Sequence, residues 1–218
     1  MMGGGIPRGE VTLVYGEANA GKTTLALQCA ASASRENMKT LYLDCENSFS
    51  LERLAQIASN DLRRVTPNIF VCKLQNFHEQ SILVEEMDRY VSKSVALVVA
   101  DTVTSLYCLE LGSPLQVFSS NRSLNRQLAY LNQTAKACNI AVLLTSQVHT
   151  ITQGIDTTQI EPVATRVLKF WSQNILTIKT DPKPSVRRVI LEKHSDSSRI
   201  GASCLVILDR NGLVDLLL

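Results

Sequence analysis

The pattern G-x-x-x-x-G-K-[ST] lies near the start of the chain and constrains its fold more than any other feature. The residues that form it are Gly16, Glu17, Ala18, Asn19, Ala20, Gly21, Lys22 and Thr23. The apolar run 11–15 before it is typical of a strand, and residues 24–35 after it are typical of a helix. A small-residue loop between a strand and a helix points backbone N–H groups and the positive end of the helix dipole at one site. The pattern therefore predicts a polyphosphate-binding loop.

Individual residues of this loop have separate expected roles. Lys22 would reach the β- and γ-phosphates of ATP, and the Thr23 hydroxyl would be a ligand of Mg²⁺. Gly16 and Gly21 permit backbone torsions and close approaches that a Cβ atom would block. The alternative is a chance octapeptide on an ordinary turn, and the matching strand and helix favour the loop. We expect the whole loop, with Thr24, to bind ATP and Mg²⁺.

The bulk composition is that of an ordinary folded domain. The chain has 218 residues, of which 45% are hydrophobic, so it can bury a substantial core. No apolar run approaches the roughly 20 residues of a membrane span, and no signal peptide is visible, so we expect a cytoplasmic protein without membrane contact. The formal net charge of +2 does not by itself indicate a nucleic-acid partner, although basic residues gather between positions 161 and 193.

Short apolar runs recur along the chain and predict an α/β fold. They lie at 11–15, 40–44, 69–74, 95–101 and 140–145. Continuous apolar runs suit strands that are buried on both faces of a parallel sheet. The segments between them have helical periodicity, and Ser50 is suited to cap a helix over 51–58. The order predicts a mostly parallel central sheet flanked by helices.

The last part of the chain has a different pattern. Residues 174–180, 186–193, 202–208 and 213–217 read as strands with short connections, and Asn211-Gly212 suits a type I′ hairpin turn. We therefore expect a C-terminal antiparallel extension within a single domain over 1–218. Two stretches, 102–120 and 148–163, read as irregular loops at the carboxyl edge of the sheet. We expect the second to be mobile without ligand.

Three further side chains complete the predicted nucleotide site. Asp101 ends an apolar strand and would hold Mg²⁺ through water, opposite Thr23. Glu46 follows the strand 40–44 and is the candidate general base, with Asp44 as its competitor. Gln147 ends another strand and could sense the γ-phosphate.

Taken together, these motifs resemble the RecA superfamily of recombinase ATPases and, within it, the archaeal RadB group. The matching segments are GGGIPRG (3–9), LYLDCENSFSLERL (41–54), TSQV (145–148), EPVA (161–164), KP (183–184) and LEKH (191–194). The resemblance implies a RecA-like P-loop NTPase core without an N-terminal DNA-binding domain. It identifies Glu46 with the catalytic glutamate, Arg53 with an arginine that stacks on adenine, and Gln147 with a switch segment before the second DNA-binding loop.

The resemblance implies an ATP-binding, weakly hydrolysing protein of DNA repair that regulates homologous recombination without strand exchange. Its partners would be single- or double-stranded DNA, contacted without sequence preference through His149, Arg166 and Lys169. The main archaeal recombinase and a Holliday-junction resolvase are implied as protein partners. Lys193 could stabilise phosphoryl transfer across a homo-oligomer interface, although an ordinary hairpin-end charge is equally compatible.

Two alternatives stay open at this point. The chain could be a KaiC-like signalling ATPase of the same fold, acting through protein partners with no DNA role. It could also be an ATP-gated binding module without useful turnover. DNA affinity at low salt separates the first alternative from the main hypothesis.

Overall fold

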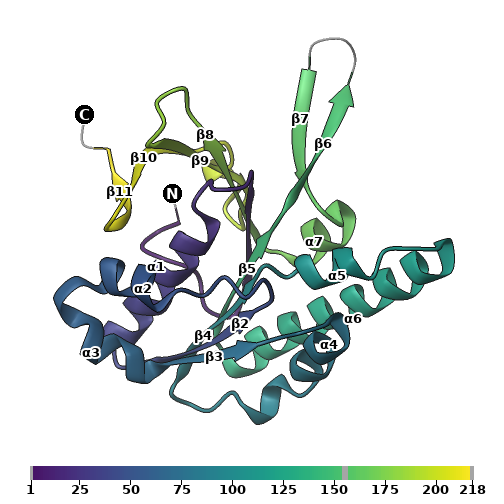
Figure 1. Ribbon diagram of the computed structural model, residues 1–218, viewed down its shortest axis with the longest axis horizontal. Helices are drawn as coiled ribbons and strands as arrows, with labels where there is room; N and C mark the ends of the chain where they lie inside the picture. Colours follow the sequence, from purple (N-terminus) through teal and green to yellow (C-terminus); the bar gives the residue numbers. More distant parts are fainter. Residues whose placement is uncertain (1, 154–156, 217–218) are drawn as a thin grey trace.

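A nine-stranded sheet forms the centre of the computed structural model, which describes residues 2–153 and 157–216 (Figure 1). The strand order is β11-β10-β9-β8-β1-β5-β4-β2-β3. The parallel strands are β1 (Val11–Gly16), β2 (Lys39–Asp44), β3 (Ile69–Lys73), β4 (Val95–Asp101), β5 (Ala141–Ser146) and β8 (Asn174–Thr180). The antiparallel strands that follow are β9 (Val186–Lys193), β10 (Ser203–Asp209) and β11 (Gly212–Asp215). The predicted α/β fold is confirmed.

Helices cover both faces of this sheet. One face carries α1 (Lys22–Arg35), α2 (Leu51–Ala58) and α3 (Leu62–Val65), and the other carries α4 (Phe77–Glu85), α5 (Ser105–Leu109), α6 (Pro114–Cys138) and α7 (Thr165–Trp171). Short 3-10 turns lie at Ser59–Asp61, Thr66–Asn68, Met87–Arg89 and Ser197–Arg199. No helix within the described residues is long and apolar enough to cross a membrane.

The central strands explain why the apolar runs in the sequence are continuous. Every residue of β1, β4 and β5 is buried, because helices pack against both faces. Along β1, Leu13 and Tyr15 join the core beneath α6 and α7, while Val14 joins the core beneath α1. Each fully buried aliphatic side chain contributes about 1.5–3 kcal/mol of transfer free energy. This core fixes the carboxyl ends of the strands, where the candidate site lies.

The expectation of an irregular loop over 102–120 is wrong. The segment contains α5 and the first turns of α6. Ser113 caps α6 in a capping box with Gln116, and Pro114 occupies the first turn, where its missing N–H has no cost. The helix therefore begins at Pro114, ten residues before Leu124, the first leucine of the apolar stripe on α6.

The expectation of an irregular loop over 148–163 is also wrong. Strands β6 (Val148–Gln153) and β7 (Thr157–Pro162) pair antiparallel, and the hairpin projects beyond the sheet (Figure 1). Residues 154–156 of the predicted mobile segment lie outside the described residues. The mobility of this segment stays a prediction.

The C-terminal strands occur where the sequence predicts them, with one correction. Asp209 pairs with Gly212, so the turn residues are Arg210 and Asn211. Of Arg210, Asn211 and Gly212, only Gly212 has a positive φ, of 117°. The predicted type I′ turn at Asn211-Gly212 is therefore wrong, because that turn needs positive φ at both central residues.

Candidate nucleotide-binding site

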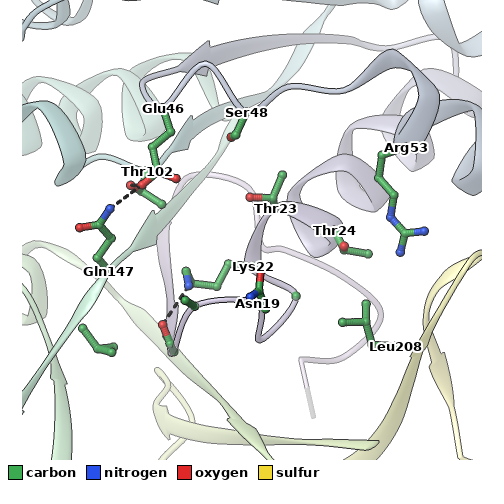
Figure 2. Close-up of a pocket in the computed structure, with 14 residues that line it drawn as sticks. Asn19, Lys22, Thr23, Thr24, Glu46, Ser48, Arg53, Thr102, Gln147 and Leu208 are labelled. Carbon is green, nitrogen blue, oxygen red and sulfur yellow. Dashed lines mark hydrogen bonds between the residues drawn. The ribbon is translucent and has the colours of Figure 1, made fainter. Parts of the chain in front are cut away.

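A cavity of about 710 Å³ opens at the carboxyl edge of the sheet, directly above the loop between β1 and α1. Residues from the loop, from β10 and from the segments after β2, β4 and β5 surround it (Figure 2). The lining residues are Gly16, Ala18, Asn19, Gly21, Lys22, Thr23, Thr24, Glu46, Ser48, Arg53, Thr102, Gln147, Val148 and Leu208. The structure therefore brings most of the sequence-predicted nucleotide residues together around one cavity.

The loop needs its small residues at two positions. A Cβ atom on Gly16 would lie 2.3 Å from the carbonyl oxygen of Ile178, so only glycine permits this approach to β8. Gly21, which precedes α1, has a φ of 106° in the left-handed region. Asn19, at the crown of the loop, is also left-handed, with a φ of 60°. These torsions turn the chain sharply into the first turn of α1.

Lys22 lies at the centre of the cavity. Its Nζ donates to the carbonyl oxygens of Gly16, at 2.9 Å, and Glu17, at 2.8 Å. Burial lowers the pKa of Lys22, while the nearby carboxylates of Glu46, Asp101 and Glu17 oppose this shift. The ammonium group is thus partly desolvated and surrounded by oxygens, an environment that favours an additional anionic partner.

Asp101 ends β4 and is fully buried. Its carboxylate accepts hydrogen bonds from the hydroxyls of Tyr42, at 2.7 Å, and Thr145. Burial raises the pKa of Asp101, and hydrogen bonds from Thr145, Tyr42 and Thr23 oppose that shift. The contact with Thr23 puts the two predicted magnesium-binding residues next to each other.

Glu46 faces the cavity, whereas Asp44 does not. The Oε1 atom of Glu46 accepts hydrogen bonds from the Thr102 hydroxyl and from Nε2 of Gln147, the latter at 2.7 Å (Figure 2). Asp44 is fully buried, and its carboxylate accepts the backbone N–H groups of Ser48 and Phe49 at 2.9 and 3.1 Å. Of the two alternatives for the general base, the geometry favours Glu46, because Asp44 stabilises the turn after β2.

Arg53 lies at the opposite end of the cavity from Glu46, on α2 (Figure 2). Its guanidinium donates to the carbonyl oxygens of Asp209, at 2.7 Å, and Arg210, at 3.0 Å. Ser50 caps α2 by accepting the Arg53 N–H, as the sequence predicts. The turn between β10 and β11 therefore holds the arginine side chain in place, beside Leu208 at the cavity wall.

Comparisons with known proteins agree with this geometry. A protein-family match to Rad51 covers residues 1–215. The chain belongs to the Rad51 family. It is 31% identical over 212 residues to a protein of Methanosphaera stadtmanae named DNA repair and recombination protein RadB, covering 96% of this chain and 90% of the relative. A protein of the same name from Methanocaldococcus jannaschii is 32% identical over 192 residues, covering 88% of this chain and 87% of the relative.

A solved structure described as the crystal structure of the RadB recombinase superposes on this Rad51-family chain with a TM-score of 0.82. The two chains are 30% identical, and the match covers 99% of this chain and 94% of the other. The predicted resemblance to the RecA superfamily and to RadB proteins is confirmed.

The residues predicted to contact DNA gather around the base of the β6–β7 hairpin. His149 and Arg166 are exposed, on β6 and α7 respectively. Lys169 on α7 forms an ion pair with Glu161 at 3.7 Å, and Glu161 is the strand partner of His149. One of the two predicted cationic contacts is therefore already paired with an acid.

Lys193 does not line the cavity of its own chain. Its Nζ donates to the carbonyl oxygens of Lys169, at 2.9 Å, and Ser172, at 2.7 Å, and so caps the C-terminal end of α7. Two of the three N–H donors of the ammonium group are therefore used within the chain.

Sequence reasoning missed several residues of the site. Thr102, Ser48 and Leu208 line the cavity. Thr102 directly follows Asp101 and Ser48 follows Glu46 by two positions, so their proximity to motif residues was an available signal. Leu208 lies on a late strand and carries no motif, so only the folded chain reveals it.

Proposed function

We propose that this Rad51-family chain is a RadB-like protein of DNA repair and homologous recombination that binds ATP, Mg²⁺ and DNA and hydrolyses ATP slowly. The single observation that carries the proposal is that Lys22, Thr23 and Glu46 line one cavity while Asp101, buried beside it, is hydrogen-bonded to Thr23. The cavity volume lies within the range of about 300–1,000 Å³ that is usual for small-molecule sites.

The residues present fit a nucleotide with its magnesium ion. The loop before α1 offers main-chain N–H groups in a cradle that a Cβ on Gly16 would disrupt. Thr23 and Asp101 supply the oxygen ligands that Mg²⁺ prefers, with Asp101 acting through water. When bound, the ion would neutralise charge on the β- and γ-phosphates. Arg53, whose guanidinium donates to two carbonyl oxygens of the turn after β10, would stack on the adenine.

Glu46 is suited to orient and deprotonate the attacking water. Thr102 and Gln147 both donate to its Oε1 atom, so Oε2 is the oxygen that would accept the proton. Gln147 immediately precedes β6, so a change in its contact with Glu46 would reach the hairpin directly. This link gives ATP a route to alter the proposed DNA-binding surface.

DNA binding should be weak and independent of sequence. Arg166 is exposed, but Lys169 is already paired with Glu161. If Arg166 contacts one phosphate and Lys169 leaves Glu161 to contact a second, the slope of log affinity against log salt is about −1.8 for duplex DNA and about −1.4 for single strands. Regulation of recombination without strand exchange, and binding of the main recombinase or a Holliday-junction resolvase, are proposals that rest on the resemblance.

A salt titration with fluorescent oligonucleotides tests the proposed DNA role. Fluorescence anisotropy of single- and double-stranded DNA is measured between low and physiological salt, with and without ATP and Mg²⁺. The proposal predicts binding at low salt that weakens with the slopes given above. If neither DNA binds at low salt while ATP does, the DNA role is wrong and a signalling ATPase is the better description.

A further inference from the structure

Arg187 carries a positive charge inside the fold, behind the phosphate loop. It lies on β9 with only 8% of its surface exposed. Its Nη1 atom donates to the carbonyl oxygens of Pro184, at 2.6 Å, and Val186, at 2.9 Å. Its Nη2 atom donates to the carbonyl oxygen of Asn19, at 3.3 Å. The guanidinium therefore bridges the β8–β9 turn and the phosphate loop.

No acidic side chain neutralises this charge within the part of the chain that the structure describes. Arg187 forms no ion pair there, and its buried Nε atom has no hydrogen-bond partner among those residues. Buried charges are normally paired, because desolvation of an unpaired ion is costly. Because the unpaired charge lies behind an anion-binding loop, an anion bound in that loop would stabilise the folded protein.

The β8–β9 hairpin contacts the phosphate loop at three points. The carbonyl oxygen of Ile178 packs against Gly16, and the Thr180 hydroxyl donates to Oε2 of Glu17 at 2.9 Å. Arg187, the strand partner of Thr180, provides the third contact, to Asn19. The hairpin thus forms a continuous support along the back of the loop.

The contact to Asn19 fixes the peptide group between Asn19 and Ala20 in the phosphate loop. The Asn19 carbonyl is bound by Arg187, and the N–H of Ala20, in the same peptide unit, donates to the Glu17 carbonyl at 3.2 Å. Because a peptide unit is planar, two such bonds set its orientation. Asn19 holds a left-handed φ of 60° that a non-glycine residue adopts at a cost.

We propose that Arg187 is a positioning residue of the nucleotide site, which pre-forms the loop through Asn19 and adds a positive charge that favours polyphosphates. The inference rests on the proposed ATP binding. A phosphate loop that already has its bound conformation loses less entropy when ATP binds. The positive charge of Arg187 also attracts every phosphate that the loop holds. The side chain itself stays behind the cavity and does not line it.

The test compares Arg187→Met and Arg187→Lys with the matched control Arg188→Met. Arg188 is the next residue on β9, is exposed, and forms a long ion pair with Asp181, at 4.0 Å. Dissociation constants for ATP, ADP and AMP are measured by calorimetry or competition, well below the melting temperature of each variant. The expected loss for Arg187→Met is at least about tenfold for ATP, roughly 1.4 kcal/mol, and is smaller for AMP. Arg187→Lys should be intermediate, because one ammonium group cannot bridge Pro184 and Asn19.

Several results would overturn the inference. If both Arg187 variants bind ATP within twofold of the unaltered protein, Arg187 does not position the nucleotide site. If AMP is weakened as much as ATP, Arg187 does not favour polyphosphates and the inference is wrong. If Arg187→Met does not fold, the ATP affinity of Arg187→Lys is compared with that of the unaltered protein instead, and a difference within twofold contradicts the inference. Lys22→Ala separates this test from the proposed function: if the unaltered protein binds ATP and Lys22→Ala abolishes it, a failure of the Arg187 test leaves ATP binding intact.

Discussion

Replacing Glu46 by glutamine tests the proposed hydrolysis most selectively. Glutamine has nearly the same size, and its carbonyl oxygen can still accept the hydrogen bonds from Thr102 and Gln147. What it loses is the ability to take a proton from the attacking water. The substitution therefore removes the base while keeping the surrounding contacts.

The contacts around Glu46 set the size of the expected effect. A positioned general base contributes about 10²–10⁴ in rate. Because Gln147 stays in place and can still orient the water, we expect the lower end, a loss of about a hundredfold or ~2.7 kcal/mol in the barrier. The substitution also removes a negative charge near the triphosphate. Two unit charges 4 Å apart in water interact with about 1 kcal/mol, so the ATP dissociation constant should stay unchanged or fall by up to about fivefold.

Phosphate release under single-turnover conditions is the assay, with ATP binding measured in parallel. Glu52→Gln, which changes an exposed carboxylate on α2, is the matched control and should behave like the unaltered protein. Equal phosphate release from Glu46→Gln and the unaltered protein would remove Glu46 from catalysis. A parallel loss of ATP affinity would mean that the carboxylate helps to hold the nucleotide instead.

Two further substitutions test the loop and the magnesium-binding carboxylate. Gly16→Ala forces a Cβ atom to within 2.3 Å of the Ile178 carbonyl, so the free energy of unfolding should fall by about 1–3 kcal/mol. Thermal denaturation of Gly16→Ala beside the unaltered protein checks this, and equal melting temperatures would contradict it. Burial raises the pKa of Asp101, so its ionised form costs stability at neutral pH, and that cost disappears as the pH falls below the raised pKa. Asp101→Asn removes this ionisation, so the free energy of unfolding should depend less on pH between 7 and 4 than in the unaltered protein. The variant should also weaken Mg²⁺-dependent ATP binding. An unchanged pH dependence in urea titrations would refute this.

Local sequence signals predicted much of the fold, because they reflect local physics. Continuous apolar runs predicted β1, β4 and β5, which are buried on both faces. Ser50 predicted the start of α2, since its hydroxyl accepts the N–H of Arg53 whatever the rest of the fold does. The start of α6 also has a local signal, the capping box Ser113-Pro114-Leu115-Gln116, which lies outside the apolar periodicity of the helix.

The parts that sequence reasoning missed depend on pairing between distant segments. The β6–β7 hairpin forms by strand pairing in a stretch of mostly polar residues, where periodicity is a weak signal. The carbonyl groups that hold Arg53 come from residues 156 and 157 positions later in the chain. Arg187 lies in the basic region between positions 161 and 193, and nothing in the sequence indicates that it is buried against Asn19, 168 residues away. Such contacts follow from the sheet order, which motifs do not specify.

ATP binding measured by calorimetry in the presence of Mg²⁺ tests the central claim most directly. We expect one ATP site on the unaltered protein and no detectable heat for Lys22→Ala, whose folding is verified by circular dichroism. An unaltered protein that does not bind ATP, or a folded Lys22→Ala variant that binds it with the same affinity, would contradict the proposed role of the loop.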